Sequence, residues 1–451
     1  MLNRTAPCKI RRLLIVLAMS MQLTNCSAIE PENTGPTVDA EDFGAAGDGV
    51  KDDTLALRRA ISAAKHGVLV LEEGHVYLVS GMLEIDFPLE IRGGGVLKAS
   101  TDIEKHVGAS GRDSLLRFTR KASGSRLSGI TVDLAGAGRN AVDVEAPGMR
   151  IQDLTVRNYS KKLKSDNIRH RTTESGLRIK ASDVIAQNVR CDNMVTHEKD
   201  SVPRCINVQG GVTKVFLKNI SGHKINGGIV IGSSSGVRID GYDFRDLTDN
   251  GLYILPGAMD TVATDGYLEN TNEPVVFEGQ QTRVSGLRVH NQGQSFGLEN
   301  ADGVILEDVE VTFDDRLTTR PAFIRTRREN QKSSGIRLRR IKASMPMGDS
   351  VLALAHGAII DMELVESNFR LELDNGRFPD VYIVRQVTGE ALRISDSTFQ
   401  FDGKRAANIK KLIVKVPPQQ KDRMQRNDQG NRFLLKGDPM SVTVRESQFR
   451  N

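Results

Sequence analysis

The sequence has few of the residues that build a large compact core. It contains no Trp, 5% aromatic residues and 14 Pro in 451 residues, and its hydrophobic content is 39%. Glycine, by contrast, is abundant at 42 residues. Many glycines with few aromatic residues are typical of short strands joined by tight corners. Length alone allows two or three ordinary domains or one elongated repeat structure.

Motifs that would identify a particular chemistry are also lacking. No cluster of residues has the spacing of a metal site, no phosphate-binding glycine loop precedes a helix, and no strand-elbow serine motif occurs. We therefore expect no cofactor. A calcium ion in the acidic turns is the one metal to consider, and no motif supports it.

The N-terminus has the layout of a secretory signal, which we place at residues 1–28. Four basic residues precede the apolar run LLIVLAMSMQL, 13–23, and small or polar residues follow it. That run is too short to span a bilayer comfortably. We expect a periplasmic, outer-membrane-associated or secreted protein. The stretch LTNC, 23–26, also resembles a lipoprotein box, so a lipid anchor at Cys26 is the one membrane attachment expected.

The leader accounts for most of the net charge. Without its four basic residues the chain keeps 58 basic against 57 acidic residues. The overall pI near 8.9 therefore does not indicate a polyanionic partner, and no nucleic acid is expected. The oligomeric state stays open.

Two of the four cysteines, Cys191 and Cys205, lie outside the leader. Their separation of 14 residues is no metal signature. In an oxidising compartment they can form a disulfide, and two free buried thiols are the alternative.

A short unit recurs through the middle of the chain. Six segments with period-2 alternation contain a central apolar residue, and these residues are separated by 29, 23, 23, 23 and 21 positions. Period-2 alternation predicts half-buried strands. The six residues are Leu177, Ile206, Ile229, Leu252, Val275 and Phe296.

A second row of strands accompanies the first. These strands begin at Val237, Val262, Val284 and Val304. A recurrence near 22 residues with three strands is too short for propeller blades, and neither the leucine-rich frame nor a helical period is present. It favours a parallel β-solenoid in which like residues stack from coil to coil. Less regular strands continue the pattern at 322–326, 351–355, 381–385 and 411–415.

The stretch DFGAAGDGVKDDTLALRRAI, Asp42 to Ile61, precedes the repeat. Glycines permit its turns, and Asp52, Asp53 and Thr54 are candidate N-caps of a helix with apolar positions Leu55, Ala60, Ile61 and Ala64. This stretch resembles the N-terminal signature of the pectate-lyase-like, right-handed parallel β-helix superfamily, which includes polygalacturonase-related enzymes, tailspike depolymerases and mannuronan C5-epimerases. The resemblance implies an all-β, single-stranded right-handed parallel β-helix over 38–450, with three strands per coil and an N-terminal capping helix within 38–66.

Two insertions interrupt the repeat before Leu177 and before Ile206, and insertions in a solenoid map to loops on one face. The first, 158–175, is strongly basic, which fits either a solvated charge run or a groove that binds acidic sugars. Acidic residues in later turns would line the same edge. The expected substrate-binding residues are Lys161, Lys162, Lys164, Arg169, His170, Asp246, Asp249 and Glu269.

The second insertion and the turn after it combine histidine, lysine and arginine. β-Elimination or C5-epimerisation of a uronic acid needs a cation to neutralise the carboxylate, a base for the C5 proton and an acid. Side chains stacked one coil apart would lie about 5 Å from each other. We expect Arg204 or Arg169 as the neutralising group, His197 or Lys224 as the base, and Tyr159 or His223 as the acid; for each histidine alone a packing or surface role is the alternative.

Resemblance to particular enzymes is partial. His197–Glu198 is similar to half of the Asp-Pro-His-Glu signature of mannuronan epimerases, with Val195 and Thr196 in the place of Asp-Pro. Gly222–His223 is followed by Lys224, where polygalacturonase-type hydrolases have a second glycine. Asp246, Asp249, Glu269 and Glu273 could instead supply the two carboxylates of a hydrolase.

Two classes of function follow. The first is an exported polysaccharide-active enzyme, with a lyase on an acidic bacterial exopolysaccharide favoured over an epimerase or hydrolase. The second is a non-catalytic β-helix that binds polysaccharide during assembly or export. The polar segment 416–433 is expected to be a long exposed loop.

Overall fold

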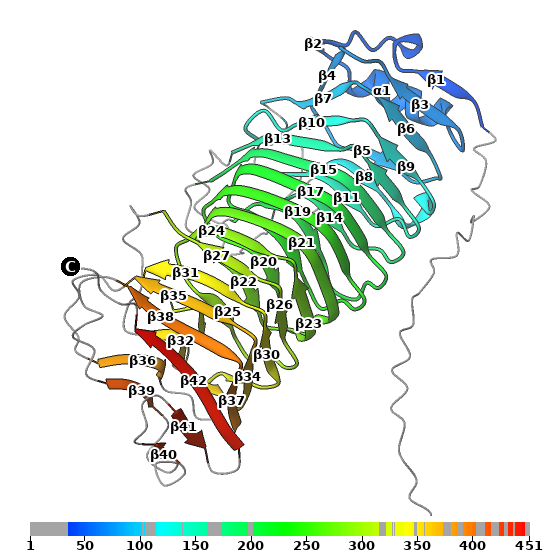
Figure 1. Ribbon diagram of the computed structural model, residues 1–451. Coiled ribbons are helices and arrows are strands. Elements are labelled where there is room, and N and C mark those ends of the chain that lie inside the picture. The colour runs from blue at the N-terminus through cyan, green and yellow to red at the C-terminus, as the bar shows by residue number, and fades with distance from the viewer. Residues whose placement is uncertain are drawn as a thin grey trace, which may run out of the picture. The chain divides into compact units, whose positions relative to one another are not determined.

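Three strands form each coil, as the recurrence near 22 residues predicts (Figure 1). The computed structural model describes residues 35–101, 103, 114–137, 139–160, 174–196, 202–314, 322–326, 328, 330–346, 350–355, 357–372, 380–385, 391–402, 411–415, 424–427, 432–435 and 438–446. All of them belong to one unit, Asn33–Asn451. The predicted signal at 1–28 and the candidate lipid anchor lie outside the described residues.

One side of the coil is a parallel sheet of 13 strands in the described part of the chain, called here the 13-stranded sheet. Its strands follow one another along the coil axis. In chain order they are β5 (Leu83–Ile85), β8 (Ser114–Phe118), β11 (Asn140–Val144), β14 (Ser175–Ile179), β16 (Arg204–Val208), β18 (Gly227–Ile231), β20 (Asn250–Ile254), β22 (Glu273–Phe277), β25 (Phe296–Leu298), β28 (Ile324–Thr326), β32 (Ser350–Ala355), β36 (Asp380–Arg385) and β39 (Lys411–Lys415).

The second and third sides together form one larger sheet, because four long strands run around the corner between them without a break. These strands are β15 (Ile185–Met194), β17 (Phe216–Ile225), β19 (Arg238–Leu247) and β21 (Met259–Thr271). The rest of the second side is β1 (Thr37–Asp39), β3 (Val68–Leu71), β6 (Glu90–Gly93), β9 (Arg126–Ser128), β12 (Arg150–Gln152), β23 (Gln280–Ser285), β26 (Ile305–Glu307), β30 (Ile336–Arg339), β34 (Asp361–Val365) and β37 (Ala391–Ser395).

The third side leads into the 13-stranded sheet. Besides the long strands it contains β2 (Asp48–Asp52), β4 (Val76–Val79), β7 (Val96–Ala99), β10 (Thr131–Asp133), β13 (Thr155–Tyr159), β24 (Arg288–Gln292), β27 (Glu310–Thr312), β31 (Lys342–Pro346), β35 (Asn368–Glu372), β38 (Ser397–Asp402) and β42 (Asp438–Glu446). A separate short pair is formed by β29 (Lys332–Ser333) and β33 (Ala358–Ile359).

The apolar column predicted from the repeat is confirmed. Leu177, Ile206, Ile229, Leu252 and Val275 are direct register partners on successive strands of the 13-stranded sheet. All are fully buried in the single apolar interior of the coil. Each coil therefore buries its inward side chains against the next coil, which is how a solenoid builds a continuous core.

The second row of strands is also present, but its four valines are not register partners. Val262 lies opposite Arg238, and Val284 lies opposite Ala263 and Leu306. The strands of this row therefore start at different positions in successive coils.

Residues with positive φ turn the chain at the corners. At the corner between the second and third sides, Asn188 and Asn219 have φ values of 54° and 52°. Their amides form a ladder, since Asn188 donates to Asp153 at 2.8 Å and Asn219 donates to Asn188 at 3.1 Å. Asn and Asp tolerate this left-handed conformation and bond locally, so they occupy corners where other residues are strained.

The predicted helix is present as α1 (Thr54–Ala63), preceded by the 3₁₀ turn η1 (Glu41–Phe43); a second 3₁₀ turn, η3 (Arg120–Ala122), follows β8. One expected position was wrong: Leu55 is 66% exposed, and Leu57 faces the core with Ala60 and Ile61. Leu57, Ala60, Ile61 and Ala64 have the i, i+3, i+4, i+7 spacing of a buried helix stripe. The Asp53 carboxylate accepts from the backbone N–H groups of Ala46 and Gly47 instead of capping the helix.

The segment expected to be a long loop contains strands. β40 (Met424–Asn427) pairs antiparallel with β41 (Arg432–Leu435), which in turn pairs with β42. The polar composition of the segment gave no signal of these two strands. The remainder of 416–433 lies outside the described residues. Among the described residues, no helix has the length and apolar character needed to cross a bilayer.

Candidate functional site

Several residues expected at the site lie outside the described residues. They are His197, Lys161, Lys162, Lys164, Arg169 and His170. The connectivity around them is clear: 161–173 joins β13 to β14, and 197–201 precedes β16. The strands that follow the two insertions, β14 and β16, are parallel neighbours in the 13-stranded sheet and begin at the same edge.

Arg204, the first residue of β16, lies at that edge. Its Nη2 donates to Oδ2 of Asp249 at 2.6 Å and approaches Oδ1 of Asn250 at 3.4 Å, so the side chain crosses β18 to reach the start of β20. The crossing is possible because residue 227 is glycine. A Cβ at Gly227 would lie 2.0 Å from Nη1 of Arg204.

The Arg204 guanidinium is held in a dry environment. Its side chain is 5% exposed, and it lies 5.8 Å from the centre of the Tyr253 ring. Burial lowers the pKa of Arg204, and the negative charge of Asp249 opposes that effect. Nε and Nη1 are buried without a hydrogen-bond partner. Buried N–H groups of this kind are costly to leave unsatisfied.

The polar chain continues from Asn250 along the sheet. Asn250 Nδ2 donates to Oε2 of Glu273 at 2.9 Å, and Arg325 Nη2 donates to Oε1 of the same carboxylate at 2.8 Å. Glu273 is fully buried. This carboxylate therefore contacts Arg325 of β28 directly and is linked to Arg204 of β16 through Asn250.

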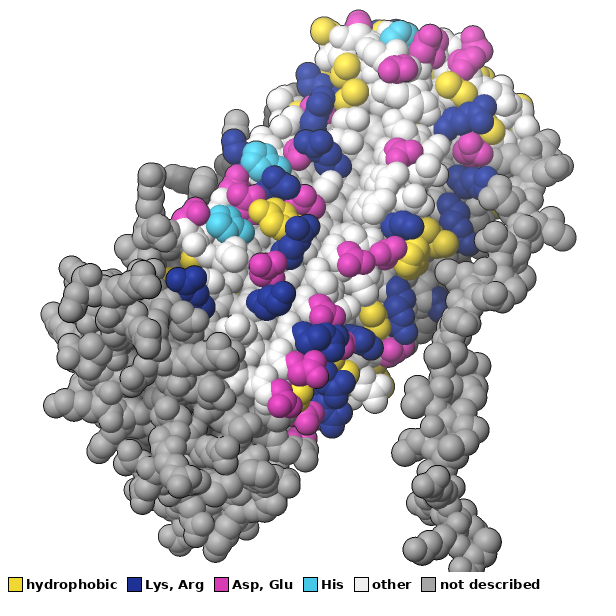
Figure 2. Space-filling model, in the orientation of Figure 1, with side chains coloured by type: hydrophobic (Ala, Val, Ile, Leu, Met, Phe, Trp, Pro, Cys, Tyr) yellow, Lys and Arg dark blue, Asp and Glu magenta, His cyan; other side chains and the backbone are white. Residues whose placement is uncertain are grey.

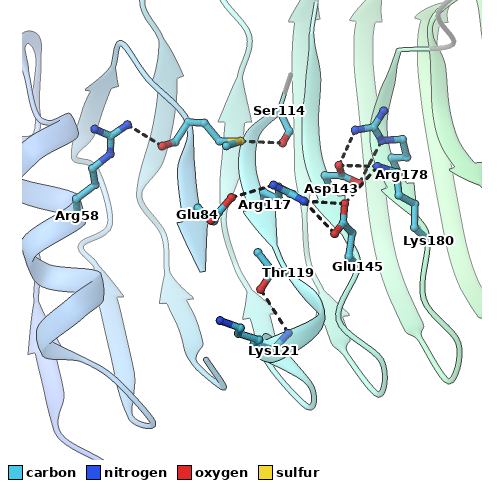
Figure 3. A network of polar contacts seen from close by, with 11 residues as sticks. Arg58, Glu84, Ser114, Arg117, Thr119, Lys121, Asp143, Glu145, Arg178 and Lys180 are labelled. Atoms are coloured by element: carbon cyan, nitrogen blue, oxygen red, sulfur yellow. Dashed lines mark hydrogen bonds and ion pairs between the residues drawn. The ribbon is translucent and has the colours of Figure 1, made fainter. Parts of the chain in front are cut away.

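A second cluster on the same sheet was not foreseen from the sequence (Figure 3). Asp143 on β11 is fully buried and accepts from Nε and Nη2 of Arg178 at 3.1 and 2.5 Å. Lys180 Nζ lies 3.0 Å from the same carboxylate. Two basic side chains thus hold one buried carboxylate.

The cluster extends toward the N-terminal coils. Arg117 on β8 donates to Glu84 at 2.9 Å and to both oxygens of Glu145 at 3.1 and 3.0 Å (Figure 3). Burial alone would lower the pKa of Arg117, but the hydrogen bond and charge of Glu145 outweigh burial and raise it. Glu84, Arg117, Asp143 and Arg178 are successive register partners. The signal in the sequence was a charged residue directly after the central apolar residue of consecutive strands.

His223 and Lys224 lie on the third side, away from the outer face of the 13-stranded sheet. His223 Nε2 lies 3.0 Å from Oδ2 of Asp246, and both side chains are about half exposed. Lys224 occupies a corner with a φ of 53°. The Glu269 carboxylate accepts from Tyr267 at 3.2 Å and lies 3.8 Å from Arg245. Figure 2 shows basic and acidic side chains interspersed over the surface in view.

The structure therefore brings together only some of the expected residues. It pairs Arg204 with Asp249, and His223 with Asp246, in two separate places. The two pairs separate because Asn226, a buried residue between β17 and β18, turns the chain from one side to the next. Tyr159, one of the two residues expected to act as the acid, is almost fully buried. Its hydroxyl donates a hydrogen bond to the carboxylate of Glu174.

Cys191 and Cys205 form a disulfide with a Cα–Cα distance of 5.5 Å. It joins the inward faces of β15 and β16, and Cys205 directly follows Arg204. The bridge therefore encloses the second insertion and anchors both of its ends beside Arg204.

Buried or half-buried carboxylates on the described part of this face are held by guanidinium groups. The carboxylates of Asp143, Asp249 and Glu273 each contact a basic side chain. The acidic turns considered for calcium do not gather into a group of three ligands among the described residues.

Comparison with known proteins gives consistent relationships. The family model "Rhamnogalacturonase A/epimerase, pectate lyase-like" matches residues 37–316. No curated protein sequence matches the chain.

The solved structures that resemble it share the fold at low identity. The family 28 exopolygalacturonase of Yersinia enterocolitica is 12% identical with a TM-score of 0.58. The matched region covers 79% of this chain and 78% of the exopolygalacturonase chain. The mannuronan C-5 epimerase A-module of Azotobacter vinelandii is 15% identical with a TM-score of 0.53, over 84% of this chain and all (100%) of that one. A GH87 α-1,3-glucanase catalytic domain in complex with nigerose is 11% identical with a TM-score of 0.50. The match covers 84% of this chain and 67% of the glucanase chain. Because the family model covers most of the described coils of this three-sided parallel β-helix, the chain belongs to the rhamnogalacturonase A/epimerase, pectate lyase-like family.

Proposed function

We propose that this protein is an exported lyase that cleaves an acidic, uronate-containing bacterial exopolysaccharide on the outer face of the 13-stranded sheet. The observation that carries the proposal is the buried guanidinium of Arg204, whose Nε and Nη1 have no hydrogen-bond partner. A uronate carboxylate would supply acceptors for Nε and Nη1 and share this cation with Asp249.

In the reaction, Arg204 neutralises the uronate carboxylate. This makes the C5–H bond acidic, because the charge that develops on removal of the proton is stabilised by a fixed cation. A base takes the C5 proton, the C4–O bond breaks, a C4–C5 double bond forms, and the leaving sugar oxygen gains a proton. We assign the base to His197, whose segment leads into β16 immediately before Arg204. The basic residues of 161–173 would bind neighbouring uronates.

Ion pairing on this face favours elimination over hydrolysis. Hydrolysis needs a carboxylic acid that donates a proton to the leaving oxygen. The described carboxylates closest to Arg204, Asp249 and Glu273, accept hydrogen bonds from arginine. Elimination instead needs a cation beside the uronate carboxylate. The ion pair with Asp249 holds Arg204 in place for that role.

Two features support export. The N-terminal 28 residues have the pattern of a secretory signal, and the Cys191–Cys205 disulfide is typical of an oxidising compartment. The exported protein is either released after signal cleavage or held to the membrane by a lipid at Cys26. Incorporation of radiolabelled palmitate, with and without a Cys26→Ala change, would distinguish these two forms.

The direct test is a screen of the purified mature protein against acidic bacterial polysaccharides. Each reaction is followed by the ultraviolet absorbance of unsaturated uronate ends, by reducing ends and by the uronate epimer ratio. A lyase raises the first two together. Reducing ends without unsaturated ends indicate a hydrolase, and a changed epimer ratio with intact chains indicates an epimerase; either result contradicts the proposal.

A non-catalytic polysaccharide-binding protein is the second candidate. It is favoured by the mutual pairing of charges in the Asp143 cluster, where each described side chain already has a partner of opposite charge. Such a protein would retain polymer on a column or in a gel-shift assay without producing any of the three chemical signals.

A further inference from the structure

A group of potential metal ligands lies at the N-terminal end of the coil, outside the face assigned to polysaccharide. We propose that Glu41, Glu72 and His75 form a binding site for a divalent transition-metal ion of the zinc class. One ligand atom from each residue lies within 4.8 Å of the other two. His75 Nδ1 is 2.8 Å from Oε1 of Glu41 and 3.8 Å from Oε2 of Glu72.

Three segments that are distant in the sequence build the group. Glu41 begins η1, Glu72 follows β3, and His75 immediately precedes β4. Both β3 and β4 are short parallel strands that pair with the next coil, so the turn between them presents Glu72 and His75 at a fixed place. The group therefore links η1, near the start of the described chain, to the turn between β3 and β4.

Tyr77 orients two of the three segments. Its side chain is fully buried, its hydroxyl donates to Oε1 of Glu41, and the hydroxyl oxygen accepts from the backbone N–H of Glu72 at 3.0 Å. Hydrogen bonds of this kind, made to a ligand by a neighbouring group, orient ligands in metal sites and are a large part of their affinity.

The backbone of a fourth segment closes on the imidazole. A Cβ at Gly47 would lie 2.9 Å from the Cβ, Cγ and Nδ1 atoms of His75. Gly47 also has a φ of 61°, where glycine is favoured on conformational grounds. The ring is therefore held against the chain, with Nδ1 turned toward the carboxylates.

The charges of the group are incompletely balanced by protein alone. In the described part of the chain, neither Glu41 nor Glu72 forms an ion pair with lysine or arginine, and both face the same His75 nitrogen. One proton on Nδ1 can bridge to a single carboxylate. A divalent cation can bind all three atoms at once and neutralise both carboxylates, which a proton cannot do.

The donor set selects the class of metal. One imidazole nitrogen and two carboxylate oxygens suit Zn²⁺ and similar ions, which accept three protein ligands with a fourth position open to water. Calcium takes 6–8 oxygen ligands and has little affinity for imidazole, so it fits this group poorly. The donor atoms therefore distinguish this group from the calcium site considered for the acidic turns.

Titration of the metal-free full-length mature protein with Zn²⁺ tests the proposal. Isothermal calorimetry should show one saturable site, and Zn²⁺ should raise the melting temperature, whereas Ca²⁺ at equal concentration should do neither. The two probes are the metal ions alone, so the result is independent of polysaccharide activity and of the proposed function.

Adjacent residues supply a matched pair of variants. Glu72→Gln should weaken Zn²⁺ binding at least about tenfold, in line with the loss of one group of a metal site, and His75→Ala should abolish saturable binding. Glu73→Gln removes a neighbouring charge outside the group and should leave the affinity unchanged. Circular dichroism confirms that each variant is folded. If His75→Ala does not fold, Glu41→Gln replaces it as the variant expected to weaken Zn²⁺ binding.

Each remaining outcome overturns the proposal. The first is absence of saturable Zn²⁺ binding by the wild-type protein. The second is equal weakening by Glu72→Gln and Glu73→Gln, which would indicate diffuse electrostatic attraction. The third is retention of binding by His75→Ala, which would place the ion elsewhere, for instance at the exposed His223–Asp246 pair.

Discussion

The guanidinium of Arg204 occupies the space where any residue other than glycine at position 227 would place its Cβ. That Cβ would lie 2.0 Å from Nη1 of the arginine, and only 2.6 and 2.7 Å from its Cδ and Cζ atoms. Arg204 and Gly227 are also register partners on adjacent strands. The position of the arginine therefore depends on the absence of a side chain one coil away.

Gly227→Ala should displace Arg204 from Asp249. We expect a loss of about 1–3 kcal/mol in the free energy of unfolding, the usual cost of overpacking, together with loss of polysaccharide binding. Gly210→Ala is the matched control, since its Cβ would meet its nearest neighbour at an ordinary 3.4 Å. Urea unfolding and polymer binding measure the two effects. Equal behaviour of the two variants would show that Gly227 does not position the arginine.

Asp143→Asn should be strongly destabilising. It leaves Arg178, which is buried, and Lys180 without their shared anion. Removing one partner of a buried ion pair costs about 3–5 kcal/mol, because the other charge stays buried and uncompensated.

Asp240→Asn provides the comparison. Asp240 pairs with Lys218 at 3.7 Å on the surface, with both side chains more than 40% exposed. An exposed pair of this kind contributes about 0–1 kcal/mol. If urea unfolding gave similar losses for both variants, the Asp143 cluster would not be the buried structural unit described above.

Reduction of the Cys191–Cys205 disulfide should lower the melting temperature. The bridge closes a loop with a sequence separation of 14. In the chain-entropy model, a loop of about 15 residues contributes roughly 3 kcal/mol. A Cys191→Ser, Cys205→Ser double variant should melt at the temperature of the reduced wild-type protein and should not respond to reductant. A response by the double variant would point to another thiol-dependent effect.

Acid should destabilise the coil in part through Glu307 and Asp308. Burial opposes ionisation of Glu307, but Arg340 and Arg283 outweigh burial and lower its pKa below the ordinary 4.5. A hydrogen bond from Arg340 lowers the pKa of Asp308 below 3.8. Because both groups ionise more easily in the folded state, their stabilisation is complete above the ordinary values and disappears as the pH falls through the lowered ones.

Arg340→Met should therefore reduce the acid dependence of stability. The free energy of unfolding of the variant should fall less steeply than that of the wild type as the pH is lowered from about 5 to about 2. Denaturant unfolding at several pH values measures this slope. Identical slopes would mean that Arg340 does not set these two pKa values.

The interior of the coil was predictable because its signal is local and repeated. The column from Leu177 to Val275 was identified to the residue, since strands with period-2 alternation must place one set of side chains inward. The disulfide was one of two open alternatives, because the spacing of two cysteines does not show whether their β-carbons approach each other.

The outer face was less predictable because its contacts join distant residues. Arg204 contacts Asp249, 45 positions away, and Arg325 contacts Glu273, 52 positions away. Nor does the repeat show where the corner falls within each coil. As a result His223 was grouped with Arg204, although Asn226 separates the two sides on which they lie.

The most direct test of the polysaccharide site is the affinity of an acidic polysaccharide for Arg204→Gln compared with Arg288→Gln. Arg288 is an exposed arginine on β24, on the third side, stacked 5.7 Å from the Tyr267 ring. Both changes remove one positive charge, so general attraction of a polyanion falls equally in the two variants. We predict that Arg204→Gln lowers affinity and the rate of unsaturated-end formation at least about tenfold, consistent with the loss of a charged hydrogen bond, while Arg288→Gln stays close to wild type. Equal affinities and rates for the two folded variants would contradict a polysaccharide site at Arg204.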